Sequence, residues 1–298
     1  MFIFINFVLL FVVVYGDCPQ SVPACSAPVA RLNDGHLMPR FGFGTWLGLD
    51  KYQLPVPVDG EAVQLAVLAA IDAGYRHIDT ASIYDDEDQV GRAVNQKIAD
   101  GAVKREDMFI TTKTKNIRPY ADIDYLETWR GMVEAKRLGL ASSIGVCNFN
   151  LTQLRRLWDS HELKPAVLQV ETNLNQQQPE LRQFCHSRGV QVVGYTPFGS
   201  LFPDRAAPDA PPPRADDPQL LAIADRHNKT VPQVVLRYLF ELGVTPIPKS
   251  VTKSRIEQNR DIFDFSLDEF DRQQLRSYHT GHRVVDLKIF SDANHYPF

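Results

Sequence analysis

The sequence predicts an α/β protein whose parallel strands form a (β/α)8 barrel. Short apolar runs alternate with helix-length amphipathic segments along most of the 298 residues, and this alternation is typical of a parallel sheet. The polar residues that could carry chemistry stand where strands end, as Asp79 and Lys113 do. In a barrel of this kind the carboxyl ends of the strands form the active face.

Each expected element follows from local pattern. Apolar-polar alternation around Asn33-Asp34-Gly35 predicts a hairpin over residues 29–38. Elsewhere apolar residues at helical spacing predict helices, and the short apolar runs between them predict strands. We expect strands at 41–46, 75–80, 108–113, 143–147, 167–171, 191–197 and 244–249. We expect helices at 59–73, from about 87 to 100, at 125–138, 151–158, 179–187, 218–227 and 231–242, and a last one capped by Ser266 and Glu269. That makes seven strands, one fewer than the barrel needs.

The composition is that of a globular protein, with 44% hydrophobic and 23% charged residues. A net charge of −4 gives no reason to expect binding to nucleic acid or to an anionic membrane surface. Residues 203–218 are rich in proline and charge, so we expect a long surface loop, which is either a lid or a loose insert. No metal site is expected.

Residues 2–15 are almost wholly apolar and end before Gly16. The run is too short to span a bilayer comfortably, and it fits the core of a signal peptide cut near Gly16–Asp17, although no Lys or Arg precedes it. We therefore expect a signal peptide at 1–16, a leader at 17–28 and a barrel domain at 29–298. The expected location is the secretory pathway, with the cytoplasm as the alternative and with no membrane contact after processing.

Four cysteines and two glycosylation sequons bear on that location. Cys18 and Cys25 could pair with each other in a secreted protein, or remain free thiols. Cys147 and Cys185 are expected to be buried. The sequons begin at Asn150 and Asn228, and they have meaning only if the chain enters the secretory pathway.

Several motifs resemble the aldo-keto reductase family in the correct order. Gly74 to Gly91 (GYRHIDTASIYDDEDQVG) resembles its first signature. IGVCNF at 144–149 is similar to IGVSNF, and QVE at 169–171 is similar to the end of NQVE. GYTPFG at 194–199 and IPKS at 247–250, with Arg255 and Asn259 after it, complete the series. The final HYPF resembles insect-type members. The resemblance covers roughly residues 29–298.

The resemblance implies hydride transfer from a nicotinamide to a carbonyl. Tyr84 would be the general acid, Lys113 would lower its pKa, and Asp79 would pair with Lys113. The alternative for Lys113 is a surface lysine at a strand end. No residue pattern identifies the substrate beyond a small carbonyl compound, and we expect a monomer.

The same resemblance implies NADP(H) as the cofactor. Tyr195 would stack under the nicotinamide, and Asn148 and Gln169 would hold its carboxamide. Lys249, Ser250 and Arg255 would hold a 2′-phosphate, which favours NADPH over NADH; the alternative is a solvated basic face. The other expected cofactor-site residues are Asp79, Asn259, Thr45 and Trp46, of which Trp46 would also line the substrate pocket.

One part of the family pattern is missing. Members place a helix and a strand, which carries the catalytic His, between the strand ending at Lys113 and the helix at 125–138. Here about ten residues separate the two elements, too few for a βα unit of about 30 residues. We expect the strands at 109–113 and 143–147 to meet directly, at lower stability.

Three functions remain open from the sequence. The first is an active NADPH-dependent carbonyl reductase. The second is a truncated form that keeps cofactor binding but has little or no turnover. The third is a secreted binding protein that reuses the barrel.

Overall fold

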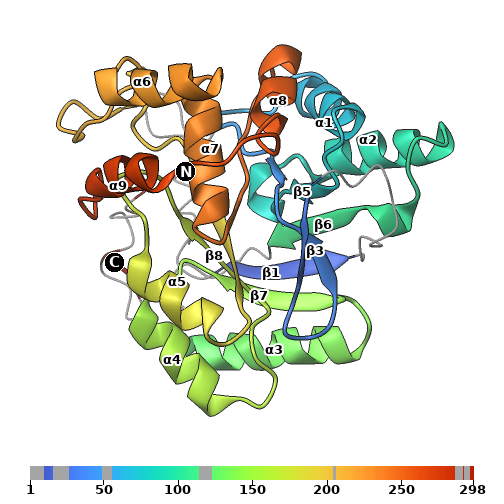
Figure 1. The fold of residues 1–298 in the computed structure, drawn as a ribbon. Coiled ribbons are helices and arrows are strands. Elements are labelled where there is room, and N and C mark those ends of the chain that lie inside the picture. Colours follow the sequence, from blue (N-terminus) through green and yellow to red (C-terminus); the bar gives the residue numbers. More distant parts are fainter. Residues whose placement is uncertain are drawn as a thin grey trace.

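The computed structural model describes residues 10–15, 27–48, 56–113, 123–203, 206–285, 291 and 296–298. Its helices surround a central sheet (Figure 1). The strands are β1 (Leu10–Tyr15), β2 (Val29–Arg31), β3 (Leu37–Pro39), β4 (Phe43–Gly44), β5 (His77–Asp79), β6 (Phe109–Lys113), β7 (Ser143–Cys147), β8 (Val167–Glu171), β9 (Gln191–Tyr195) and β10 (Val244–Pro246).

The helices are α1 (Ala62–Asp72), α2 (Glu87–Ala99), α3 (Tyr125–Arg137), α4 (Leu151–Ser160), α5 (Pro179–His186), α6 (Pro218–His227), α7 (Val231–Glu241), α8 (Lys253–Arg260) and α9 (Glu269–Ser277). Two short 3-10 turns, η1 (Ser82–Tyr84) and η2 (Arg105–Asp107), precede α2 and β6. None of the described helices is long and apolar enough to cross a membrane.

The sheet contains eight strands in the order β10-β9-β8-β7-β1-β6-β5-β4. Its two end strands are joined as well, because Gly42 N donates to Pro246 O at 3.1 Å and Gly44 N donates to Pro248 O at 3.1 Å. The sheet therefore closes on itself, as the predicted barrel requires. The β2–β3 hairpin, predicted at 29–38, lies at the amino ends of the strands, where Asn33 Nδ2 donates to Pro165 O just before β8.

The strand between β6 and β7 comes from the chain's own N-terminus. β1 pairs antiparallel with β6 on one side and with β7 on the other (Figure 1). The expectation that β6 and β7 meet directly is therefore wrong, and so is the count of seven strands. The sequence favoured a signal peptide over a strand for these residues. Cleavage near Gly16, which would remove β1, stays a prediction.

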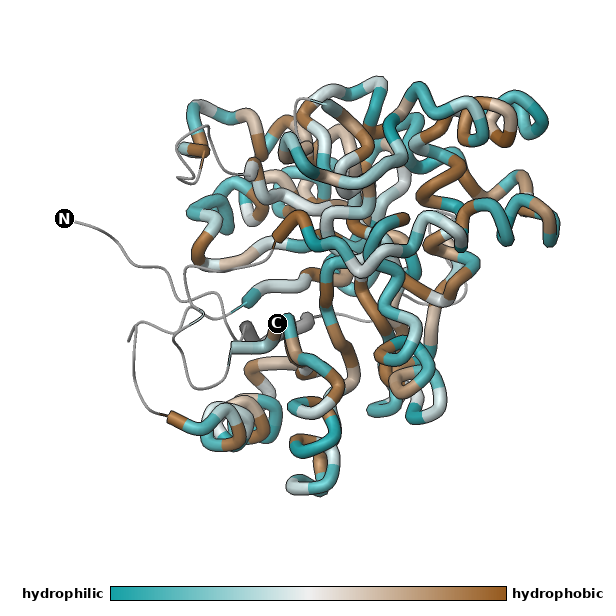
Figure 2. Tube along the Cα trace, turned by 90° about the vertical axis from the view of Figure 1, so that its left-hand side faces the viewer, coloured by the Kyte–Doolittle hydropathy of each residue, from teal (hydrophilic) through white to brown (hydrophobic). Residues whose placement is uncertain are grey.

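The core contains two large hydrophobic clusters. One joins α3 to α7 with β7–β9 and contains the buried side chains of Trp129, Leu154 and Leu239. The other joins α1, α2 and α8 with β4 and β5 and contains Val67, Ile78 and Ile256. Hydrophilic and hydrophobic stretches alternate along the surrounding helices (Figure 2), as expected for helices that bury one face.

Some predicted boundaries need correction. The last helix is capped by Asp268, whose carboxylate accepts from Asp271 N, and not by Ser266. α8 was not expected, because its mean hydropathy is low and it buries only Ile256 and Asn259. The strand expected at 191–197 ends at Tyr195, since Thr196 has a φ of +49°. Asn150 and Gln153 form a capping box at the start of α4.

The long loop before α6 packs against the barrel instead of hanging loose. Ala215 N donates to Leu201 O at 2.9 Å, and Asn175 Nδ2 donates to Pro212 O at 2.7 Å. Ala210 is buried at 8% exposure. These contacts indicate that the described part of this loop is held against the barrel, which argues against a loose insert. Residues 114–122, Cys18 and Cys25 lie outside the described residues, so a disulfide between the two cysteines stays a prediction. Cys147 and Cys185 are buried free thiols, as expected.

Gly145 offers a test of the packing between β7 and β8. A Cβ at this position would lie 2.5 Å from Val167 O, a backbone atom that cannot move aside cheaply. We expect Gly145→Ala to lower the free energy of unfolding by about 1–3 kcal/mol or more. Gly131 in α3 is the matched control, because a Cβ there meets nothing within 4 Å, and Gly131→Ala should stabilise by about 0.5–1 kcal/mol. Denaturant unfolding measures both, and equal effects would contradict this account of the packing.

Candidate active site

Three polar side chains meet at the carboxyl ends of β5 and β6. Lys113 Nζ donates to Asp79 Oδ1 at 2.6 Å and to the Tyr84 hydroxyl oxygen at 3.3 Å. Lys113 and Asp79 are almost completely buried, at 1% and 2% exposure. Tyr84 comes from η1, the turn that leads from β5 to α2. The predicted proton-donating cluster is therefore assembled in the structure.

The charges in this cluster support one another. Burial is the largest single influence and lowers the pKa of Lys113, but Asp79, Tyr84 and Cys147 together outweigh it and raise the pKa above its ordinary value. Lys113 thus stays an ammonium. Removing one partner of such a buried pair leaves an uncompensated charge, at a typical cost of about 3–5 kcal/mol. The pair therefore couples the catalytic site to stability.

The pKa of Tyr84 differs from the sequence expectation. Tyr84 is half-buried as a residue, but its hydroxyl lies among buried groups, and this burial raises its pKa above the ordinary value. Lys113 opposes the rise, as predicted, but does not reverse it. The phenol therefore holds its proton at neutral pH. A proton donor needs that state before it reacts.

The cluster is held from several sides. Gln169 Nε2 in β8 donates to Asp79 Oδ2 at 2.7 Å, and Lys113 Nζ also donates to Thr80 O at 2.9 Å. The Trp46 ring stacks on the Tyr84 ring, with centroids 6.1 Å apart and planes at 23°. The phenol is thus fixed between an indole and an ammonium. Trp46 therefore lies at the site, as predicted.

Tyr195 and Asn148 form a second group at the same end of the barrel. The Tyr195 hydroxyl donates to Asn148 Oδ1 at 2.9 Å. Asn148 follows β7 and Thr196 follows β9, and both have positive φ, at +62° and +49°. Such conformations in non-glycine residues cluster at functional sites. Cys147 adjoins this group, with its Sγ 3.9 Å from Gln169 Oε1, and burial raises its pKa to about 12.

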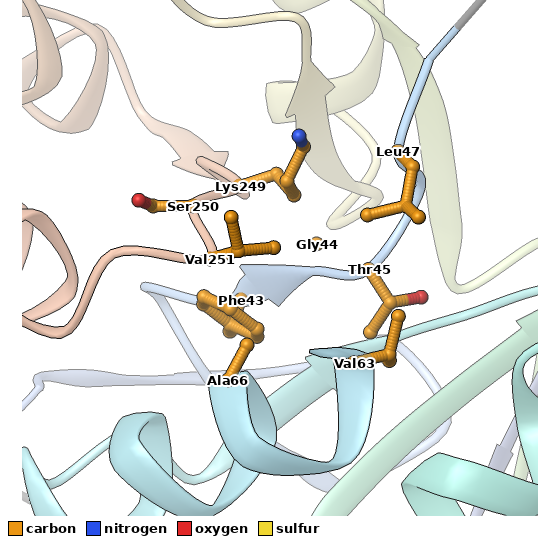
Figure 3. Close-up of a pocket in the computed structure, with 9 residues that line it drawn as sticks. All are labelled: Phe43, Gly44, Thr45, Leu47, Val63, Ala66, Lys249, Ser250 and Val251. Carbon is orange, nitrogen blue, oxygen red and sulfur yellow. The ribbon is translucent and has the colours of Figure 1, made fainter. Parts of the chain in front are cut away.

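A small pocket lies between the end of β4, α1 and the segment after β10 (Figure 3). Phe43, Val63, Ala66 and Val251 form its apolar part, and the Lys249 side chain extends away from α1. Gly44 permits the close approach of the two segments, because a Cβ there would lie 3.0 Å from Ile247 O. The structure thus brings the predicted Thr45, Lys249 and Ser250 together.

The remaining predicted residues lie on α8. Asn259 is buried at 6% exposure, and Arg255 is exposed. Their roles in cofactor binding stay predictions. In the described part of the chain, no histidine follows a barrel strand at the catalytic end. His77 begins β5 and lies inside the barrel, where its Nε2 is 3.0 Å from Thr111 Oγ1.

Two residues near the site were not singled out by sequence reasoning. Glu171 is fully buried at the end of β8, and its carboxylate accepts from Val284 N and Val285 N at 2.8 Å each. It ties the C-terminal segment to the barrel. Ser200 is buried after β9, and its Oγ has no hydrogen-bond partner among the described residues. Glu171 lies in the QVE motif, which was the available signal; Ser200 had none.

Comparison with known proteins identifies the family. A sequence model described as the aldo/keto reductase family matches residues 40–122 and 116–279. The chain belongs to the aldo-keto reductase family. It is 40% identical to aldo-keto reductase AKR2E4 of Bombyx mori over 311 aligned residues, covering 92% of this chain and 99% of that protein. It is 33% identical to human aldo-keto reductase family 1 member C1, covering 90% and 96%.

Solved structures of family members are similar throughout the barrel. The structure of Bombyx mori AKR2E4 in complex with NADP has a TM-score of 0.85 at 40% identity, with 91% of this chain and 99% of that chain covered. The structure of AKR2E5 complexed with NADPH has a TM-score of 0.85 at 38% identity, with 92% and 94% covered. The barrel fold is confirmed, and by family this aldo-keto reductase is an oxidoreductase.

His77 makes the stability of this aldo-keto reductase depend on pH. Burial, with a smaller contribution from Lys113, lowers the pKa of His77 from 6.5 to about 3. Below pH 6.5 His77 is therefore protonated in the unfolded chain but stays neutral in the folded chain. The free energy of unfolding decreases as the pH falls. Lowering the pH from 7 to 5 should therefore reduce the free energy of unfolding by roughly 2 kcal/mol.

Denaturant unfolding of wild type and His77→Gln at the two pH values measures this contribution. When the pH is lowered from 7 to 5, the free energy of unfolding of the variant should decrease by about 2 kcal/mol less than that of wild type. His186→Gln, at the exposed end of α5, is the control and should behave as wild type. An unchanged pH dependence in His77→Gln would show that this histidine does not set it.

Proposed function

We propose that this chain binds NADP(H) and reduces the carbonyl group of an aldehyde or ketone to an alcohol. The observation that carries the proposal is the buried contact of Lys113 with both Asp79 and the Tyr84 hydroxyl. This arrangement presents a protonated phenol next to a fixed cation at the catalytic end of the barrel. The relatives crystallised with NADP and NADPH support the cofactor.

The residues of this chain fit such a cofactor. The Tyr195 ring would stack under the nicotinamide, and the Asn148 amide, which accepts from the Tyr195 hydroxyl, would hold the carboxamide. The buried Ser200 Oγ, without a partner among the described residues, would gain one from an anionic group. Lys249 and Ser250 share a pocket beside Gly44, and Arg255 follows on α8. Fixed cations and a hydroxyl suit a phosphate dianion, which favours NADPH over NADH.

The chemistry needs one hydride and one proton for each carbonyl. When bound, the cofactor would supply the hydride for the carbonyl carbon. Tyr84 donates its hydroxyl proton to the carbonyl oxygen, so the C=O double bond becomes an alcohol and the phenol becomes a phenolate. The Lys113 ammonium, held by Asp79, stabilises the developing phenolate. Solvent then returns the proton to Tyr84.

We also propose that turnover is slow compared with full-length relatives. The alignment to AKR2E4 extends over 311 residues, more than the 298 of this chain, so it contains gaps here. The described catalytic end offers no histidine to orient the carbonyl oxygen. Loss of one oriented hydrogen-bond donor costs on the order of 10²–10³ in rate. The second candidate, a chain that binds cofactor with little turnover, rests on the same observation.

The phenol of Tyr84 is the direct test of the reaction. We expect Tyr84→Phe to lower kcat for aldehyde-dependent NADPH oxidation by about 10²–10⁴-fold, because the proton donor is gone. Its Kd for NADPH should stay unchanged. Tyr278→Phe removes a hydroxyl at the end of α9 that donates to Asp217 and should leave kcat as in wild type. Wild-type turnover no faster than that of Tyr84→Phe would reject catalysis and favour the cofactor-binding candidate.

The preference for NADPH depends on Arg255. Losing one charge-assisted phosphate contact costs about 1.5–3 kcal/mol, so Arg255→Ala should weaken NADPH binding roughly 10- to 100-fold and leave NADH binding unchanged. Lys253→Ala is the control, because Lys253 is an exposed cation on the same helix. Fluorescence titration of wild type and both variants with NADPH and with NADH measures the six affinities. Equal wild-type affinity for NADH and NADPH would refute the phosphate site.

A further inference from the structure

We propose that Leu10–Tyr15 is a permanent strand of the folded barrel. It occupies the slot between β6 and β7 and holds together two walls of the catalytic site. The slot takes an extended apolar segment, and its occupant is the N-terminus of the same chain. The proposal concerns how the fold is completed, and it stands whether or not the chain turns over substrate.

The pairing is continuous on both sides of the strand. Val12, Val13 and Val14 stand opposite Lys113, Thr112 and Thr111 of β6. The same three residues stand opposite Gly145, Ile144 and Ser143 of β7. A strand paired on both sides leaves neither neighbour with an unpaired edge. Without β1, both β6 and β7 would present unpaired backbone groups, which a closed barrel otherwise avoids.

The sequence of the segment suits an interior position. Leu10–Tyr15 reads LFVVVY, with three β-branched valines and two aromatic residues. These residue types favour strands. A continuous apolar run, rather than an alternating one, is typical of strands covered on both faces. The same composition that fits a signal-peptide core therefore fits a central barrel strand.

The antiparallel direction follows from where the chain must go next. Tyr15 stands opposite Ile110, toward the amino end of β6. The chain continues to β2 and β3, whose hairpin lies at the amino ends of the strands: Asn33 contacts Pro165 and Asp34 forms an ion pair with Lys136. A parallel strand would instead end at the catalytic face, a barrel length away. The antiparallel strand delivers the chain to the correct end.

The strand reaches the site through its two neighbours. Val12 stands opposite Lys113, the cation of the proton-donating cluster, and Leu10 stands opposite Cys147, next to Asn148. Loss of the strand would free the β6 end that positions Lys113 and the β7 end that positions Asn148. A displacement of about 1 Å in such a site can cost ~10²-fold in rate. Cleavage near Gly16 would remove the strand, so cleavage and this closed barrel exclude each other.

Hydrogen exchange of the full-length chain, followed by mass spectrometry, tests the proposal without cofactor or substrate. Amides of residues 10–15 should be protected to the same degree as those of β6 and β7. A free leader would exchange at the rate of an unfolded peptide, and that result would overturn the proposal. Because this measurement uses the wild-type chain, it decides the matter even if a variant fails to fold.

Two substitutions at Val13 extend the test to the neighbouring strands. Proline removes a backbone donor and is excluded from central strands, so Val13→Pro should abolish protection of residues 10–15 and reduce it at least tenfold in residues 109–113 and 143–147. Val13→Ile keeps a β-branched residue and should exchange as wild type. If β6 and β7 in Val13→Pro were as strongly protected from exchange as in wild type, these strands would not depend on pairing with β1. Because exchange needs no turnover, failure here is distinguishable from failure of the proposed reaction.

Discussion

The structure depends on closure of the sheet between β6 and β7. A barrel strand needs a partner on each side, and the sequence between Lys113 and Asp122 is too short to supply a parallel one. β1 closes that gap with an antiparallel strand drawn from the N-terminus. Mixed sheets with one antiparallel strand are common among large sheets. The other seven strands, and the helices around them, can then keep the arrangement seen in the solved structures of family members.

The catalytic cluster relies on the same closure. Lys113 is the last residue of β6, and its charge is buried with that of Asp79 at the end of β5. Such a pair is favourable only when geometry and additional hydrogen bonds are in place, as Gln169 and Thr80 provide here. The residues proposed to bind the cofactor are spread over β7 to β10 and α8. The proposed proton donor Tyr84 is on η1, its partners Asp79 and Lys113 end β5 and β6, and β1 joins β6 to β7.

The sequence was sufficient for most of the fold and for the site cluster. Motif spacing placed Asp79, Tyr84 and Lys113 together, because each follows or ends a strand at the same edge. The net pKa of Tyr84 could not be predicted, since it depends on how far burial outweighs Lys113. The position of Leu10–Tyr15 in the sheet was not predicted either, because a continuous apolar run near the N-terminus favoured a signal peptide over a buried strand. Only the pairing partners distinguish the two. Glu171 escaped notice because its partners, Val284 and Val285, are distant in sequence.

A designed disulfide between β1 and β6 tests the central claim most directly. Val13 and Thr112 stand directly opposite each other in the antiparallel pair, and such residues have Cα atoms about 4.5–5.5 Å apart, within the range that a disulfide spans. The full-length chain with Val13→Cys and Thr112→Cys, and with Cys18 and Cys25 replaced by serine, is oxidised and mapped by mass spectrometry. The account predicts that nearly all molecules form a disulfide between positions 13 and 112. In a second variant with the mismatched pair Val13→Cys and Ile110→Cys, a much smaller fraction of molecules should be crosslinked. No crosslink, or equal crosslinking of both pairs, would contradict it.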